Sequence, residues 1–178
     1  MRLIIILFFI SIFLMQIFAD NTNDSFDIIE NYKITSSFGD SRNDHFHTGL
    51  DLAATDQDIY ALTNQELIFY NKKDYYSIKY GMGDFAVLED SNNKLRYNYS
   101  HLKEDSFTPD NVYWKKGDKI GVVGNSGHST GKHLHLEVED LENRRLLNPI
   151  QFIKAKDTMP PVIEDVYFIT KDDGKISL

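Results

Sequence analysis

The stretch His133-Leu134-His135-Leu136-Glu137-Val138 alternates polar and apolar side chains at every position. Because successive side chains of a β-strand point to opposite faces, the two leucines share one face, and His133 and His135 share the other. The leucine face can pack on a core, and the histidine face can line a groove. The stretch therefore predicts a half-buried strand that presents two imidazoles on one side.

Short runs rich in Val, Ile, Tyr and Phe extend this pattern from Ile34 onward, and Gly, Asn and Asp interrupt them. The runs 85–88 and 95–99 flank Asp90-Ser91-Asn92-Asn93, which predicts a hairpin with its turn at the Asn pair. No stretch shows the 3.6-residue periodicity of a long helix. The fold class expected is mostly β, with a single small antiparallel β domain over residues 33–153.

The composition of the 178-residue chain is that of a globular protein, with 42% hydrophobic and 26% charged residues. The formal net charge of -8, without a basic stripe, argues against a nucleic-acid partner. The chain has no cysteine, which excludes disulfides and thiolate metal ligands. Any zinc must therefore be held by His, Asp, Glu or water.

Residues 1–19 form an apolar run in which Arg2 is the one charged residue, as in a secretory signal peptide. Cleavage after Ala19 would place the large residue Ile17 at the -3 position, so an uncleaved N-terminal anchor is the alternative. Either reading predicts an exported protein in the periplasm or cell envelope, or secreted. Residues 20–32 are expected to be a polar spacer, and residues 154–178 a C-terminal tail with one strand.

Potential metal ligands gather in three short motifs. His47 and Asp51 lie in His47-Thr48-Gly49-Leu50-Asp51, His101 follows Tyr99-Ser100, and the strand described above adds its two histidines. Two imidazoles and a carboxylate make a three-ligand catalytic zinc site with an open position for water. The two remaining histidines can move protons or stabilise charge, which suits metal-assisted hydrolysis. Solvated surface residues are the alternative, which the coincidence of motifs disfavours in a chain with six histidines.

Strand alternation also suggests where His101 lies. It would place Tyr97, Tyr99 and His101 on one side of the strand 95–101. If that odd-numbered face borders the groove, Tyr99 lies beside His101 as a candidate substrate contact. His45 and His128 are close to the key motifs and are considered decoys.

Over residues 33–153 the chain resembles the lysostaphin-type (LytM-type) zinc metallopeptidases, which cut peptide cross-links in bacterial peptidoglycan. The motifs occur in the family's order: Ile34-Thr35-Ser36-Ser37-Phe38-Gly39, His47 to Asp51, Tyr99-Ser100-His101-Leu102, Lys116-Gly117-Asp118, Ile120 to Gly127, Thr130 to Val138, and Asn148-Pro149. The resemblance implies an antiparallel β domain with a long groove. It also implies that His47, Asp51 and His135 bind Zn²⁺ and that His101 and His133 are catalytic; which of the two acts as the base stays open.

The chain departs from the family in the stretch 54–61, where a Pro and a Gly are usual, which puts loop geometry in question and leaves the metal site intact. Lys132 stands where proline is common. It can reach a substrate carboxylate, with a solvated lysine as the alternative.

The function expected is therefore that of an exported zinc metalloendopeptidase acting on peptidoglycan peptides. We expect a monomer that contacts a membrane only through residues 1–19, if they are retained. Two alternatives stay open: a non-catalytic protein of the same fold that binds peptidoglycan or activates a hydrolase, and a zinc peptidase acting on proteins. The bond that is cleaved is not specified by the sequence.

Overall fold

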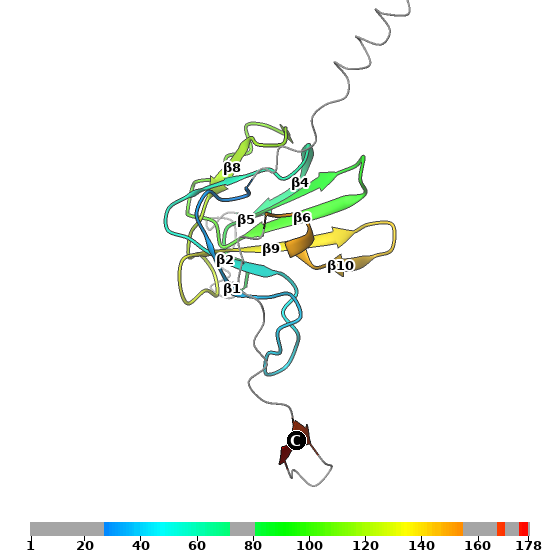
Figure 1. The fold of residues 1–178 in the computed structure, drawn as a ribbon. Helices are drawn as coiled ribbons and strands as arrows, with labels where there is room; N and C mark the ends of the chain where they lie inside the picture. Colours follow the sequence, from blue (N-terminus) through cyan, green and yellow to red (C-terminus); the bar gives the residue numbers. More distant parts are fainter. Residues whose placement is uncertain (1–26, 72–80, 155–166, 170–174, 178) are drawn as a thin grey trace, which may run out of the picture.

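The computed structural model describes residues 27–71, 81–154, 167–169 and 175–177 (Figure 1). Antiparallel strands make up nearly all of the regular structure in these ranges, and a short 3-10 turn, η1 (Pro149–Gln151), follows them. The mostly β fold predicted from the sequence is confirmed. The described residues contain no helix long and apolar enough to span a membrane, and the predicted signal or anchor at 1–19 lies outside them.

The main sheet is antiparallel and has β9 near its centre (Figure 1). Its strands follow the spatial order β1 (Lys33–Ser36), β2 (Leu50–Ala53), β9 (His133–Asp140), β6 (Leu95–Ser100), β5 (Phe85–Asp90), β4 (Gln65–Asn71) and β7 (Tyr113–Trp114), and β10 (Arg145–Leu147) pairs with the end of β9. On one side, β2 pairs with residues 133–136 of β9, and on the other side β6 pairs with residues 135–140. The strand predicted from the alternating stretch therefore has neighbours on both sides.

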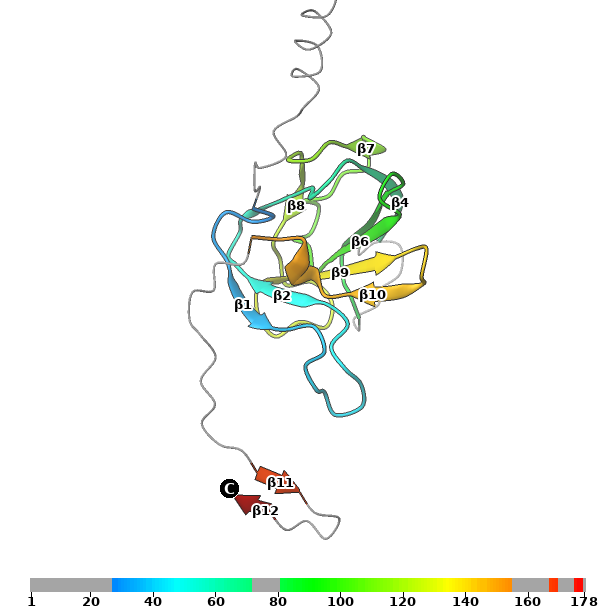
Figure 2. The same ribbon diagram turned by 45° about the vertical axis from the view of Figure 1, so that its right-hand side comes forward.

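One face of the main sheet is packed into the hydrophobic core. Leu134 and Leu136 of β9 are fully buried, as the alternation predicted, and they share one buried cluster with Ile59 and Ile120. The last two residues belong to a second, two-stranded sheet made of β3 (Asp58–Tyr60) and β8 (Lys119–Val122). Figure 2 shows this small sheet beside the main one. The opposite face of β9 is left to the polar side chains.

The hairpin predicted at Asp90 to Asn93 is present between β5 and β6, with Asp90 paired to Leu95. The Asp90 carboxylate accepts hydrogen bonds from the backbone N–H groups of Asn92 and Asn93, each at 3.1 Å, and from the Asn93 side chain at 2.7 Å. These contacts hold the turn closed and fix the register of β6, which leads directly into His101.

The expected boundaries differ from the structure at both ends. Ile28 and Ile29 fall in the predicted polar spacer but are fully buried, because their apolar side chains complete the core beside the main sheet. Within the predicted tail, the described residues form β11 (Tyr167–Ile169) and β12 (Lys175–Ser177), which pair with each other. The described part of the tail therefore contains two short strands, where one was expected.

Candidate metal centre

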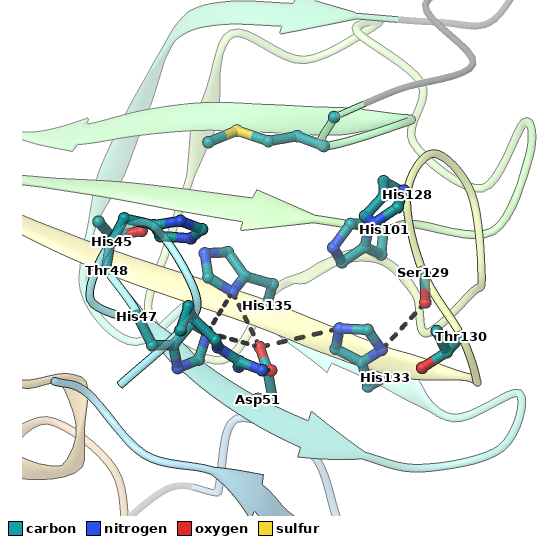
Figure 3. Close-up of a pocket in the computed structure, with 13 residues that line it drawn as sticks. His45, His47, Thr48, Asp51, His101, His128, Ser129, Thr130, His133 and His135 are labelled. Carbon is teal, nitrogen blue, oxygen red and sulfur yellow. Dashed lines mark hydrogen bonds and ion pairs between the residues drawn. The ribbon is translucent and has the colours of Figure 1, made fainter. Parts of the chain in front are cut away.

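Three candidate ligand atoms converge at the polar face of β9 (Figure 3). The register of β2 against β9 sets Asp51 directly opposite His135, and their atoms Oδ1 and Nδ1 lie 2.8 Å apart. His47, in the loop leading into β2, places Nε2 at 3.1 Å from Asp51 Oδ1 and at 3.1 Å from His135 Nδ1. These are the three residues that the family resemblance implied as ligands, and they form a candidate metal site.

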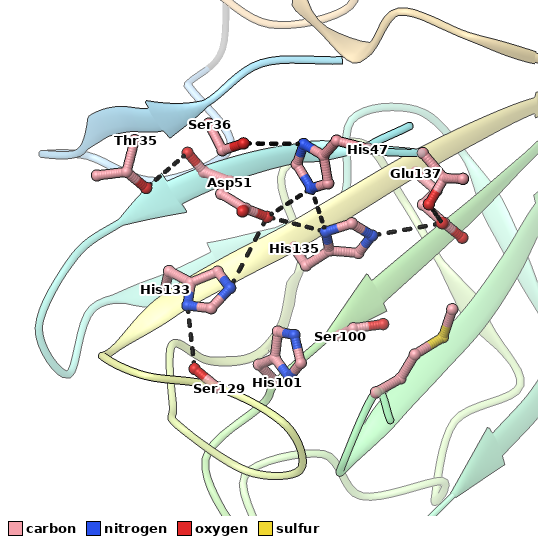
Figure 4. Close-up of polar contacts among 12 residues, drawn as sticks. Thr35, Ser36, His47, Asp51, Ser100, His101, Ser129, His133, His135 and Glu137 are labelled. Atoms are coloured by element: carbon pink, nitrogen blue, oxygen red, sulfur yellow. Dashed lines mark hydrogen bonds and ion pairs between the residues drawn. The ribbon is translucent and has the colours of Figure 1, made fainter. Parts of the chain in front are cut away.

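The contacts of the two imidazoles indicate which of their nitrogens can present a lone pair to a cation. His47 Nδ1 lies 2.8 Å from the carbonyl oxygen of Ser37, which can only accept, so the ring proton is on Nδ1. His135 Nε2 lies 3.3 Å from Glu137 Oε1, another acceptor (Figure 4). When His135 is neutral with its proton on Nε2, toward Glu137, the atoms His47 Nε2, His135 Nδ1 and Asp51 Oδ1 are three acceptors aimed at one point.

This arrangement fits a small divalent cation. Tetrahedral zinc with bonds of about 2.1 Å sets its ligand atoms about 3.4 Å apart. The three atoms here are 2.8 to 3.1 Å apart, so an ion requires them to separate by a few tenths of an ångström. Two nitrogens and one oxygen are also a donor set that zinc prefers, with a position left open for a substrate or water.

The pKa values of the site residues show that the cluster favours a positive charge. Burial alone would lower the pKa of His135, but the carboxylates of Asp51 and Glu137 outweigh it and raise the pKa to about 9. Burial opposes ionisation of Glu137, yet its contacts with His135, Thr48 and Asn98 lower its pKa to about 2. The pKa of Asp51 is also lowered, against its burial, by the three neighbouring histidines. The site thus favours a positive charge between its carboxylates.

The two candidate catalytic histidines stand beside this cluster. His133 shares the polar face of β9 with His135, and its Nε2 lies 3.7 Å from Asp51 Oδ1. The ring of His101 is 4.7 Å from that of His133 and 6.0 Å from that of His135, measured between centroids. All of the expected site histidines are therefore within one group.

Both candidate catalytic rings carry their proton on Nδ1. His133 Nδ1 lies 2.8 Å from the carbonyl oxygen of Gly131, and His101 Nδ1 lies 2.8 Å from that of Ser126. Because these carbonyls only accept, Nε2 is left as a free base in each neutral ring. Burial, together with the nearby histidines, lowers the pKa of His101 to about 4 and keeps the ring neutral.

The route by which His101 reaches the site differs from the prediction. Tyr99 is fully buried and donates a hydrogen bond to Gln65 at 3.0 Å, so the odd-numbered face of β6 belongs to the core. The even-numbered face, which includes Ser100 opposite His135, borders the site. The side chain of His101 does not follow the alternation of β6, because its backbone adopts a left-handed conformation with φ of 61° just after the strand ends. The candidate substrate contact at Tyr99 is therefore wrong.

All six histidines of the chain line one open cavity of about 400 Å³. Its remaining lining includes Arg42, whose Nη2 lies 3.6 Å from Asp51 Oδ2. His45 and His128 are at the rim, outside the three-residue cluster. Lys132 does not line this cavity; it forms an ion pair with Asp56 and borders a separate pocket.

Gly49 allows the backbone before β2 to close against His135. A Cβ atom built on this glycine would lie 2.7 Å from His135 Cε1 and 2.5 Å from the carbonyl oxygen of Leu136. Both distances are shorter than van der Waals contact, so any side chain here would displace the imidazole or the strand. The glycine in His47-Thr48-Gly49-Leu50-Asp51 is therefore explained by close approach.

Glu137 is a site residue that was not expected from the sequence. It contacts His135 on the side of the ring that faces away from Asp51. Strand parity could have found it, since Glu137 shares the polar face with His133 and His135. Arg42 had no comparable signal, because it lies in a loop whose path no periodicity predicts.

Comparisons with known proteins agree with this geometry. The model of peptidase family M23 matches residues 45–149 of the chain. The DD-carboxypeptidase/endopeptidase Mpg of Neisseria meningitidis is 32% identical over 105 residues, which cover 58% of this chain and 22% of that protein. The matched part thus spans only about a fifth of that relative's length.

Solved peptidase structures share the fold, and two of them illustrate the similarity. The catalytic domain of the antimicrobial peptidase lysostaphin from Staphylococcus simulans has a TM-score of 0.58 and 25% sequence identity, over 70% of this chain and 94% of that chain. A zinc-containing peptidase from Vibrio cholerae has a TM-score of 0.57 and 27% identity, over 74% of this chain and 39% of that chain. The expected lysostaphin-type fold is therefore confirmed.

Proposed function

Since the chain belongs to peptidase family M23, we propose that it is an exported zinc metalloendopeptidase that hydrolyses peptide bonds in bacterial peptidoglycan. The observation that carries the proposal is the convergence of His47 Nε2, His135 Nδ1 and Asp51 Oδ1 within 3.1 Å of one another. Three potential ligand atoms that converge on one point can bind a cation, and the donor set suits zinc. The zinc-containing peptidase from Vibrio cholerae, which shares the fold, supports this choice of metal.

The proposed chemistry uses the two histidines that are not ligands. Bound zinc supplies Lewis acidity and a water that is nucleophilic near neutral pH. His101 and His133 each keep Nε2 free because Nδ1 donates to a backbone carbonyl. One neutral ring can accept the proton of the attacking water, and a protonated ring can deliver a proton to the leaving amine. Either can also donate to the oxygen that becomes negative at the scissile carbonyl.

Peptidoglycan peptides are proposed as the substrate because the family resemblance points to them and because one relative is named a DD-carboxypeptidase/endopeptidase. The cavity is open, so it can admit an extended peptide. Residues 1–19 would bring the domain to the periplasm or cell envelope, as a cleaved signal peptide or a retained anchor. We keep Lys132 as a candidate substrate contact outside the histidine cavity, since its ammonium group is partly exposed.

The experiment that tests the proposal is metal analysis of the purified full-length protein together with a muropeptide digest with and without chelator. We expect about one zinc per chain and cleavage that chelator abolishes and added zinc restores. Mass analysis of the products would separate cutting of cross-links from removal of a terminal residue. Absence of zinc and of cleavage would contradict the proposal, and zinc with cleavage of proteins alone would contradict the substrate.

A further inference from the structure

The imidazole of His135 has two nitrogens in different surroundings. Nδ1 faces Asp51 at 2.8 Å and His47 at 3.1 Å, whereas Nε2 faces Glu137 Oε1 at 3.3 Å. A histidine binds metal through only one nitrogen at a time, and the proton on the other nitrogen decides which. Something on the Nε2 side must therefore hold that proton if Nδ1 is to be the ligand atom.

We propose that Glu137 is a positioning residue that fixes His135 in the orientation and tautomer needed for Nδ1 to bind the metal. This inference rests on the metal part of the proposed function. Glu137 cannot itself be a ligand in this arrangement, because the imidazole of His135 separates its carboxylate from Asp51. Carboxylates that accept the second N–H of a metal-binding histidine orient the ring and increase its basicity.

Glu137 is itself held on both oxygens. The Thr48 hydroxyl donates to Oε1, and the Asn98 side-chain amide donates to Oε2 at 3.1 Å. Asn98 is oriented in turn by the Ser100 hydroxyl, which donates to its Oδ1 at 3.0 Å. The carboxylate is only 15% exposed, so these contacts are not replaced by water. Three chain segments, the loop before β2, β6 and β9, thus meet at this side chain.

Glu139 provides a matched comparison on the same strand. It lies two residues further along the polar face of β9 and is also opposite β6, but its partner is Arg96, at 3.0 Å. A change at Glu139 therefore removes a carboxylate and an ion pair from the same surface without changing a histidine contact. An effect seen at Glu137 and absent at Glu139 therefore comes from the contacts that Glu137 alone makes, with His135, Thr48 and Asn98.

The test measures zinc affinity by chelator competition on the full-length protein and its variants. We expect Glu137→Ala to weaken zinc binding by about 10- to 100-fold, the usual effect of losing such a partner. Glu137→Gln keeps an acceptor but no charge, and we expect it to recover part of this loss. Thr48→Val frees one oxygen of Glu137 and should give a smaller loss than Glu137→Ala. Glu139→Ala should stay within about twofold of the unchanged protein.

A second readout distinguishes positioning from a merely structural role. Nitrogen–proton correlation spectra of the zinc-loaded protein should show the His135 proton on Nε2, and Glu137→Ala should lose or exchange-broaden that signal. Equal zinc affinity in Glu137→Ala and Glu139→Ala would overturn the inference. So would a proton on Nδ1 of His135 in the zinc-loaded unchanged protein.

The result is separate from the test of the substrate. If the unchanged protein binds zinc but cleaves no peptidoglycan, the affinities still decide the role of Glu137. If Glu137→Ala binds zinc normally while the unchanged protein cleaves muropeptides, the proposed function stands and this inference fails.

Discussion

Asp51 and His135 are paired across strands β2 and β9, with Oδ1 and Nδ1 2.8 Å apart. The same register sets Leu52 opposite Leu134 in the core. Because side-chain direction has a period of two, a slip of one residue would turn one candidate ligand into the core and one leucine out of it. Packing of the sheet and assembly of the candidate metal centre are therefore the same structural requirement.

Replacement of His135 by Ala should abolish both zinc binding and hydrolysis. The change removes one of three ligand atoms and leaves Asp51 without its nearest partner. Zinc per chain, measured after gel filtration, should fall from about one to near zero. His45→Ala is the matched histidine change, since His45 lies at the cavity rim with its side chain 63% exposed, and it should retain zinc. Full activity in His135→Ala would exclude the proposed metal site.

Replacement of His133 by Ala should have a different signature. His133 lies beside the three candidate ligands and is not one of them, with Nε2 3.7 Å from Asp51 Oδ1. Zinc should therefore stay bound while kcat falls by about 100-fold or more, the scale expected for a lost proton-transfer or oxyanion-stabilising group. Parallel zinc analysis and steady-state kinetics would check this. Unchanged turnover with zinc bound would remove His133 from the mechanism.

His101→Ala tests the second member of the pair in the same way, again with zinc retained and a large loss of kcat. The pH profiles of the conservative variants His101→Gln and His133→Gln would show which ring acts as the general base, because loss of the base removes the acidic limb of the profile. A variant that loses zinc instead would indicate that His101 is needed to shape the centre and not for proton transfer.

Much of this site could be predicted from strand parity alone. The alternation in residues 133–138 correctly placed His133 and His135 on one face and the leucines in the core. The alternation failed to predict the direction of His101. Hydrogen bonds from His101 N to Met82 O and from Leu102 N to Asp84 O hold the chain in a turn there, and a period-two pattern does not predict such a turn. Long-range backbone contacts of this kind are not local properties of a sequence.

The spacer shows the same limit. Ile28 and Ile29 are two apolar residues in a polar segment, which gives no periodic signal. The backbone of Ile28 is nevertheless tied to β3, since its carbonyl accepts from Tyr60 N at 2.9 Å. Burial of this pair therefore depends on a contact with a strand 30 residues later, which composition alone does not reveal.

Gly49→Ala should weaken zinc binding and destabilise the fold together. Its Cβ would lie 2.7 Å from His135 Cε1 and 2.5 Å from a backbone oxygen of β9, and the rigid strand leaves the imidazole as the group that must move. Overpacking of this kind lowers the free energy of unfolding by about 1–3 kcal/mol. Chelator competition and urea unfolding would measure the two effects.

Gly131→Ala is the control for Gly49→Ala. Gly131 lies two residues before His133, as Gly49 lies two residues before Asp51, but a Cβ there would meet nothing within 4 Å. We expect its zinc affinity and its unfolding midpoint to be close to those of the unchanged protein. If both alanine variants behaved alike, the close approach of Gly49 to His135 would not be what requires glycine.

Asp90→Asn should reduce stability near neutral pH and lose this effect in acid. Asp90 is 2% exposed, and burial would raise its pKa, but hydrogen bonds from Asn93 and Asn92 outweigh burial and lower it. A lowered native pKa stabilises the fold above the unfolded value of about 3.9, and the stabilisation disappears as the pH falls through the native value. Loss of these charged hydrogen bonds should cost about 1–3 kcal/mol near pH 7.

Urea unfolding of the metal-free protein at a series of pH values would measure this dependence. The difference in unfolding free energy between Asp90→Asn and the unchanged protein should be constant from about pH 7 to pH 5 and then shrink below about pH 4. Asp110→Asn removes a carboxylate from an exposed loop position and should change stability by less than about 0.5 kcal/mol. A gap for Asp90→Asn that persisted unchanged in acid would mean that the variant acts through shape and not through the charge of Asp90. The turn at Asp90 sets the register of β6. We therefore expect Asp90→Asn to weaken zinc affinity only under conditions in which the hairpin between β5 and β6 opens.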